Sequence, residues 1–261
     1  MGAEQAILSE VREAVGILTI NRPKTLNALD LPTLLDMEAA LDAFEADDAV
    51  RVIIVTGAGD RAFVAGGDIA DLVSRRGLAH YVEFAEVVHR VFRRFERCDK
   101  PTIAAVNGHC IGYGLTAVVA CDFVIAADHA TFSWPEVTIG IPTIIGAIRM
   151  PRKVAWADAM ELLLTGEPID AERAREIGLA WKVVPGDRLM DEARALAERL
   201  CRAAPLAARA TKEVATRTAA MSWTEAVRFG ETMRRVAAVT DDAAEGRRAW
   251  SDKRPPEWQG R

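Results

Sequence analysis

The residue of this sequence best suited to proton transfer is Glu136, which stands among apolar and aromatic neighbours in residues 131–142 (TFSWPEVTIGIP). Burial of a carboxyl group penalises its charged form and raises its pKa, and a raised pKa suits proton transfer near neutral pH. A glutamate exposed on a loop is the alternative interpretation. The sequence leaves both open, and Glu136 is a candidate base.

Two glycine-rich segments could present backbone N–H groups to a ligand. The first, residues 62–69 (AFVAGGDI), places two glycines before Asp68, which is expected to cap a short helix running through residue 72. The second, residues 100–116 (KPTIAAVNGHCIGYGLT), predicts a strand, a glycine-rich turn and a helix start. Such turns can offer main-chain donors to an oxyanion. Composition alone favours a plain tight turn with Asp68 as N-cap for the first segment.

Residues 57–62 (GAGDRA) match the loose dinucleotide-binding pattern GxGxxA after an expected strand. The residues that follow do not begin an amphipathic helix, and no acidic residue ends a second strand about 20 residues further on. We therefore expect a turn here and no nicotinamide cofactor.

The elements that would position these segments alternate between strand and helix in the first part of the chain. Apolar spacing predicts strands at residues 14–20, 51–56, 102–106 and 123–126, and helices at residues 31–46 and 114–120. Further on, segments rich in Ala, Arg and Glu predict helices at residues 187–202, 206–218 and 223–239. We expect an α/β core over residues 1–186 and a helical region over residues 187–261, packed against the core or another subunit.

Composition narrows the functional classes. The chain has 261 residues, of which half are hydrophobic, and a formal net charge of -5, which argues against a nucleic-acid partner because phosphate binding draws on clustered Lys and Arg. Residues 1–10 lack the pattern of a secretory signal, and no apolar run is long enough to span a membrane. The four cysteines form no CxxC pair and the four histidines no metal-binding pattern. We expect a cytoplasmic protein with buried thiols and no metal.

Seven short segments are spread along nearly the whole chain: residues 21–24 (NRPK), 62–69 (AFVAGGDI), 100–108 (KPTIAAVNG), 121–132 (CDFVIAADHATF), 164–166 (LTG), 178–180 (GLA) and 253–260 (KRPPEWQG). In this order they resemble the enoyl-CoA hydratase/isomerase (crotonase) superfamily from about residue 7 to the end. The resemblance implies a crotonase-like spiral of ββα units, followed by a helical C-terminal region that builds homotrimers, commonly paired into hexamers.

The resemblance also implies roles for particular residues. The family holds the thioester oxygen of an acyl-CoA on two backbone N–H groups, and those positions match Gly67 and Tyr113. Coenzyme A is part of the substrate, so no separate cofactor is expected.

The family's coenzyme A contacts match further positions of this chain. Its adenine and phosphates lie against segments that match Lys24, Ala65, Asp68 and Ile69. Lys253 matches a lysine that a neighbouring subunit offers to the phosphates. From the sequence alone, both lysines would be ordinary solvated charges.

The sequence departs from the family pattern where hydration chemistry is concerned. Family hydratases use two glutamates; the second matches Glu136, but the first falls on Thr116, whose hydroxyl cannot accept the proton of water at neutral pH. Tyr113 replaces the middle glycine of a GGG turn, and residues 142–146 (PTIIG) replace PGxGG. Tyr113 and residues 143–145 should narrow the pocket. The phenol of Tyr113 is either a polar functional group near the acyl chain or only a wall of the pocket, and the sequence leaves both open.

Three hypotheses follow from this comparison. An enoyl-CoA hydratase is the commonest activity of the family, and Thr116 counts against it. A double-bond isomerase needs an oxyanion site and one base, which Glu136 would supply. A non-catalytic acyl-CoA-binding subunit would keep the coenzyme A contacts without turnover.

Overall fold

Two β-sheets form the centre of the protein, whose computed structural model describes residues 5–74 and 78–261. Residues 1–4 of the N-terminal segment lie outside the described residues. The larger sheet has the order β1 (Ile7–Arg12), β2 (Val15–Ile20), β3 (Val52–Gly57), β5 (Thr102–Val106), β7 (Phe123–Ala127) and β10 (Lys182–Val184). The smaller sheet has the order β4 (Ala62–Val64), β6 (His109–Ile111), β8 (Thr131–Ser133) and β9 (Ile169–Asp170).

The larger sheet is parallel from β2 to β10, and only its first pair, β1 with β2, is antiparallel. Strands β3 and β5 are buried along their whole length. Parallel strands covered on both faces have nearly continuous apolar sequences, as VIIV at residues 52–55 illustrates. The predicted strands at residues 14–20, 51–56, 102–106 and 123–126 are thereby confirmed.

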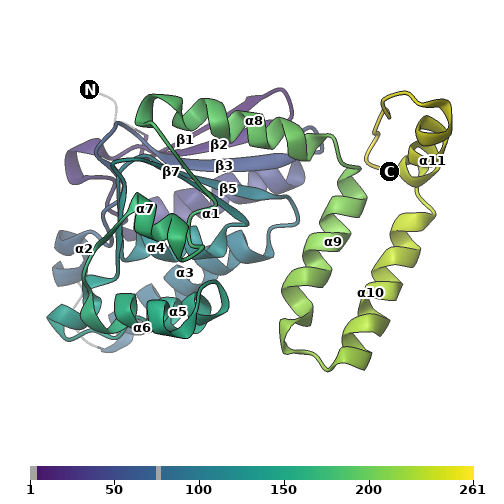
Figure 1. Cartoon of the computed structure of the whole chain (residues 1–261). Coiled ribbons are helices and arrows are strands. Elements are labelled where there is room, and N and C mark those ends of the chain that lie inside the picture. The colour runs from purple at the N-terminus through teal and green to yellow at the C-terminus, as the bar shows by residue number, and fades with distance from the viewer. Residues whose placement is uncertain (1–4, 75–77) are drawn as a thin grey trace.

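Helices cover both faces of this sheet. The helices of the described residues are α1 (Leu31–Ala46), α2 (Ile69–Ser74), α3 (Leu78–Arg97), α4 (Tyr113–Ala120), α5 (Ile144–Arg149), α6 (Trp156–Thr165), α7 (Ala171–Glu176), α8 (Leu189–Cys201), α9 (Pro205–Arg217), α10 (Trp223–Ala238) and α11 (Asp241–Asp252). Short 3-10 turns are η1 (Pro23–Thr25), η2 (Pro135–Ile139), η3 (Met150–Arg152), η4 (Gly186–Arg188) and η5 (Thr218–Ala220). Figure 1 shows α8 on one face of the larger sheet and α1, α3 and α4 on the other.

The chain repeats one unit: a strand of the larger sheet, a strand of the smaller sheet, and a helix. The units β3–β4–α2 and β5–β6–α4 follow one another, and β4 and β6 pair in parallel. Because the units repeat in register, the turns after β4 and β6 lie on the same side of the molecule. The expected α/β crotonase-like fold with a C-terminal helical region is confirmed.

The C-terminal helices divide into two groups. Helix α8 packs on the larger sheet and buries Leu189, Ala193, Leu196 and Ala197. Helices α9, α10 and α11 extend away from the core (Figure 1). The division of the chain into a core over residues 1–186 and a helical region over residues 187–261 remains a prediction. Helix α8, the first helix of the second part, lies against the core.

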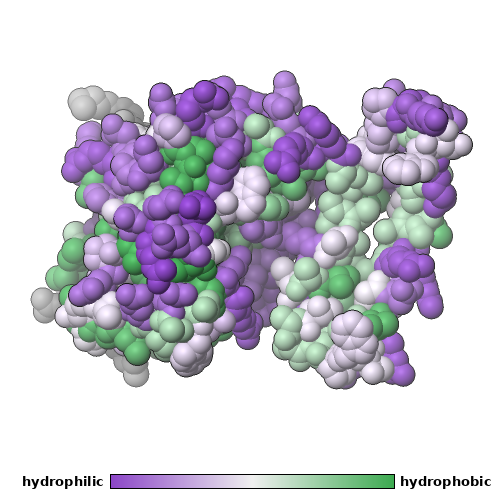
Figure 2. All heavy atoms as spheres, in the orientation of Figure 1, coloured by the Kyte–Doolittle hydropathy of each residue, from purple (hydrophilic) through white to green (hydrophobic). Residues whose placement is uncertain are grey.

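Helices α9 and α10 bury no residue within this chain. Trp223 is 84% exposed and Val239 is 86% exposed. Apolar residues gather over this part of the surface in Figure 2. Among the described residues, no helix has the length and apolarity needed to cross a membrane.

Candidate functional site

Glu136 lies in η2, directly after β8. The preceding Trp134 is fully buried and anchors the turn by donating its indole N–H to the carbonyl of Gly112, 3.1 Å away. Burial raises the pKa of the Glu136 carboxyl, while its own backbone N–H and the hydroxyl of Thr143 act in the opposite direction. The half-buried carboxyl group has the environment of a proton-transfer residue.

The two glycine-rich turns meet beside this carboxyl group. Gly112 has a φ of +53°, and a Cβ atom built on it would lie 2.7 Å from Oε1 of Glu136. The same position is 3.7 Å from the Cα atom of Gly66, which has a φ of +102°. Only glycine combines such backbone angles with this closeness. Three segments distant in the sequence therefore converge on one point.

Gly67 lies in the turn after β4, and Tyr113 follows the turn after β6. Gly67 forms an isolated parallel bridge with Leu29, in which Asp68 N–H donates to the Leu29 carbonyl over 2.8 Å. Tyr113 is the first residue of α4, and the hydrogen bond from Thr116 N–H to Gly112 begins that helix (2.9 Å). The N–H of Tyr113 therefore lies at the N-terminal end of α4, where the helix dipole favours negative charge.

The aromatic ring of Tyr113 packs on helix α3. Its centroid is 6.2 Å from that of Phe84 and 5.9 Å from that of Phe92, both of which are buried. Both contacts are tilted, an arrangement typical of favourable aromatic pairs. The side chain thereby occupies the space between α3 and the turn that holds Gly112.

Thr116 is buried in the same helix, one turn after Gly112. Its hydroxyl donates to the Gly112 carbonyl over 3.1 Å and lies 3.4 Å from the indole nitrogen of Trp134. The Thr116 hydroxyl thus donates to one neighbour, the Gly112 carbonyl, and accepts from the other, the Trp134 indole N–H. Thr116 thus joins helix α4 to the anchor of η2.

The residues matched to coenzyme A contacts lie near the first turn. Lys24 is exposed in η1, and the N–H of Ala65 donates to the carbonyl of Leu26 just after η1 (3.1 Å). Asp68 caps α2 by accepting from the N–H groups of Ala70 (3.0 Å) and Asp71 (3.4 Å), as predicted. Ile69, at the start of α2, is 76% exposed. The apolar side chain is therefore available at the surface.

Arg22 is a structural residue of this site that the sequence interpretation did not single out. Its guanidinium lies 2.9 Å from the carboxylates of both Asp30 and Asp68. Burial alone would raise the pKa of Asp68, but the hydrogen bond from Arg22 and the N–H groups of α2 outweigh it and lower that pKa. The NRPK segment could have indicated this role. Its arginine stands before a proline at the end of a buried strand, where few acidic residues are nearby in sequence, so its partners had to come from other parts of the fold.

Lys253 lies apart from these residues within one chain. It ends α11 in a left-handed conformation (φ +54°) and is exposed. Figure 1 shows α11 at the opposite side of the molecule from α2. A contact between Lys253 and coenzyme A phosphates on the same chain does not fit this separation, so the expected role requires a neighbouring subunit and remains a prediction.

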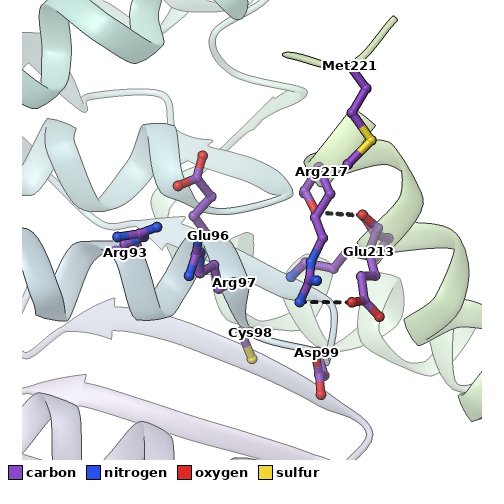
Figure 3. Close-up of a pocket in the computed structure, with 10 residues that line it drawn as sticks. Arg93, Glu96, Arg97, Cys98, Asp99, Glu213, Arg217 and Met221 are labelled. Atoms are coloured by element: carbon purple, nitrogen blue, oxygen red, sulfur yellow. Dashed lines mark hydrogen bonds and ion pairs between the residues drawn. The ribbon is translucent and has the colours of Figure 1, made fainter. Parts of the chain in front are cut away.

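A separate cavity of about 430 Å³ lies between the end of α3 and helix α9 (Figure 3). Its charges are mixed, and Arg217 pairs with Glu213 at 2.9 Å. Burial raises the pKa of the Cys98 thiol beside it to about 12, so this cysteine is a poor nucleophile. No group of His, Cys, Asp or Glu within residues 5–74 and 78–261 is arranged to hold a metal.

Comparison with known proteins identifies the family. The family model described as enoyl-CoA hydratase/isomerase matches residues 10–261. The chain belongs to the enoyl-CoA hydratase/isomerase family. A protein named crotonyl-CoA hydratase from Syntrophomonas wolfei is 39% identical over 253 residues, which are 97% of each chain. A probable enoyl-CoA hydratase from Rhizobium meliloti is 37% identical over 98% of this chain and 99% of its own.

The fold of this family member also agrees with solved structures. The crystal structure of an enoyl-CoA hydratase from Bacillus anthracis superposes with a TM-score of 0.95 at 30% identity. The superposition covers 98% of this chain and 100% of that chain. The arrangement of sheets and C-terminal helices is therefore shared over nearly the whole of this chain and all of that chain.

Proposed function

We propose that this protein is an enoyl-CoA-transforming enzyme that stabilises a thioester enolate and moves a proton at the α-carbon with Glu136. The observation that carries the proposal is the position of Glu136 Oε1 against Gly112, beside the turn of Gly66. A carboxylate next to two sets of main-chain donors is the arrangement that enolate chemistry needs.

The thioester oxygen accepts hydrogen bonds from the N–H groups of Gly67 and Tyr113 in this proposal. Negative charge grows on that oxygen as the α-carbon loses a proton or as a nucleophile adds at the β-carbon. Removing one such donor typically costs about 2.7 to 4 kcal/mol of transition-state stabilisation. The position of Tyr113 at the N-terminal end of α4 supports this role.

Hydration is the overall reaction that the relatives' names support. One water adds across the conjugated double bond: its oxygen bonds to the β-carbon, the Glu136 carboxyl group gives its proton to the α-carbon, and the proton that the water loses returns to the Glu136 carboxylate. The reverse reaction eliminates water, which places the protein among the lyases. Thr116 offers no second carboxylate, so Glu136 is the proton-transfer group in either direction.

Isomerisation is the second candidate, and the contacts of Thr116 favour it. A double-bond shift requires one base that removes a proton from the α-carbon and returns it to the γ-carbon. The Thr116 hydroxyl is already engaged by Gly112 and Trp134, whereas Glu136 faces the meeting point of the two turns. One base and one oxyanion site suffice for this reaction.

Coenzyme A enters as part of the substrate and no resident cofactor is included in the proposal. Lys24, Ala65, Asp68 and Ile69 would contact its nucleotide portion, with Lys253 supplied by a neighbouring subunit. The exposed apolar residues of α10 (Trp223, Val227 and Val236) support assembly into trimers or hexamers. The four free thiols support a reducing, cytoplasmic setting.

The test is to incubate the pure protein separately with 2-enoyl-CoA and 3-enoyl-CoA of several chain lengths. Absorbance of the conjugated thioester and product mass are followed together. Loss of absorbance from 2-enoyl-CoA with the mass gain of one water identifies a hydratase. Appearance of absorbance from 3-enoyl-CoA without a mass change identifies an isomerase. Silence with both substrate classes contradicts the proposal.

A further inference from the structure

The hydroxyl of Thr143 is directed at the catalytic candidate Glu136. Its Oγ1 donates a hydrogen bond to Oε2 of the Glu136 carboxyl over 3.2 Å. Thr143 is the N-cap residue of α5, a position where a threonine side chain usually accepts from a backbone N–H of the first turn. Here the side chain makes no such capping bond. The hydroxyl is therefore used for the carboxyl group and not for the helix.

Packing holds the Thr143 side chain in this orientation. A Cβ atom built on Gly146 would lie 2.5 Å from the Thr143 methyl carbon and 2.8 Å from the Trp134 ring, so the methyl group lies over Gly146 beside the indole. A β-branched side chain has few χ1 conformations. With its methyl group against Gly146 and Trp134, Thr143 has its hydroxyl placed towards Glu136.

The two oxygens of Glu136 consequently have different surroundings. Oε2 receives the hydrogen bond from Thr143, and Oε1 lies at Gly112, next to the turns where the thioester would bind. We propose that Thr143 is a positioning residue that holds Oε2 and so presents Oε1 to the α-carbon of the substrate. This inference rests on the proposed function of Glu136.

The hydrogen bond also affects the proton equilibrium of Glu136. Burial favours the neutral carboxyl group, whereas the Glu136 backbone N–H and the Thr143 hydroxyl favour the carboxylate. No ionised side chain of the described residues is among the influences on this pKa. Among the described residues, Thr143 is thus the side chain that opposes the effect of desolvation on the pKa of Glu136. It stands at a position where the family pattern has glycine.

The test compares Thr143→Val, which removes the hydroxyl at nearly constant shape, with Thr143→Ser, which keeps it. Thr138→Val is the matched control, because Thr138 lies in η2 beside Glu136 but its hydroxyl donates to the Pro135 carbonyl (2.7 Å). The pH dependence of kcat is measured for each protein with whichever enoyl-CoA the wild type converts. Where Glu136 acts as base, the rate rises with pH through its pKa; where it acts as acid, the rate falls.

Loss of the hydroxyl raises the pKa of Glu136. The limb of the pH profile, which is the range where kcat changes with the ionisation of Glu136, therefore moves to higher pH in Thr143→Val for either role. With Glu136 as base, kcat falls about tenfold at pH values below its pKa, since a hydrogen bond to a charged group is worth about 1.5 kcal/mol or more. At higher pH, where Glu136 is fully ionised, kcat also stays below the wild-type value, because Oε1 is no longer held towards the α-carbon. Thr143→Ser, which keeps the hydroxyl but loses the methyl group that orients it, shifts the profile less than Thr143→Val, and Thr138→Val keeps the wild-type profile. An unmoved limb in Thr143→Val, or equal shifts in Thr138→Val, overturns the inference.

A second measurement does not require turnover. Glutamate labelled with ¹³C at the carboxyl carbon is titrated by NMR in the wild type and in Thr143→Val, with Thr143→Ala as replacement where the valine variant does not fold. The Glu136 signal is assigned by its loss in Glu136→Gln. A higher midpoint without the hydroxyl supports the inference, and an identical midpoint overturns it. If the wild type is inactive but the midpoint still moves in Thr143→Val, the proposed function fails while the contact of Thr143 with Glu136 holds. The two failures are therefore distinguishable.

Discussion

The indole nitrogen of Trp134 lies 3.4 Å from the hydroxyl of Thr116, and both side chains are buried. This contact joins the helix that follows the second turn to the segment that carries Glu136. Thr116, which stands where family hydratases have their other glutamate, is thereby part of the packing that holds the segment of Glu136. The chemistry of the site accordingly centres on one carboxyl group.

Replacing Glu136 with glutamine should abolish proton transfer. The amide keeps the size of the side chain but cannot exchange the proton, and a positioned acid or base typically contributes about 10²- to 10⁴-fold in rate. Turnover of enoyl-CoA should fall accordingly, while the Kd for coenzyme A measured by calorimetry should remain close to the wild-type value. Glu167→Gln, at an exposed glutamate, is the control. Unaltered turnover in Glu136→Gln would contradict the assignment.

Introducing glutamate at Thr116 should raise hydration. The new carboxylate would supply a base for water, and Trp134 would retain its bond to the Gly112 carbonyl (3.1 Å). We expect a gain of about tenfold or more in hydration of 2-enoyl-CoA and a loss of about 1–3 kcal/mol in the free energy of unfolding, since a polar group is buried. Thr116→Gln has similar size without a base, and an equal gain there would exclude this explanation.

Adding a methyl group to Gly112 should damage the site more than the fold. Alanine there faces the strain of a positive φ and a Cβ contact of 2.7 Å with Glu136 Oε1. Gly178 is a matched control, because it has a φ of +82° and open space around its Cβ position. Both alanine variants should lose of order 1–3 kcal/mol of stability by thermal or urea unfolding. Only Gly112→Ala should lose activity as well; equal activities would argue against the site.

Shortening Tyr113 should change the preference for acyl chain length. The ring fills space against Phe84 and Phe92, so Tyr113→Ala should open room beside the thioester while keeping the backbone N–H. We expect kcat/KM for long enoyl-CoA chains to rise about tenfold relative to short ones, the effect of a few methylene contacts. Tyr113→Phe keeps the ring and should keep the preference. A chain-length profile that is identical in all three proteins would show that Tyr113 does not line the acyl pocket.

Much of the secondary structure follows from local patterns. The helix at residues 31–46 and the strand at residues 102–106 have the predicted ends, because a capping aspartate or a buried apolar run marks them directly. Helix α3 has no counterpart among the predicted elements, although its apolar residues face the core and Tyr113 packs on it. The contact of this helix with Tyr113 depends on how the rest of the chain folds, and the local sequence of the helix does not indicate it.

The sequence by itself determined the family, the α/β order of the elements, the candidate base Glu136 and the two glycine-rich turns. Tertiary structure decided which groups touch: Thr143 on Glu136, Trp134 on Thr116, and Arg22 between Asp30 and Asp68. These partners are brought together by the packing of separate strands and helices. Sequence spacing specifies the direction of a side chain within its own element, whereas contact between elements depends on how the whole core packs.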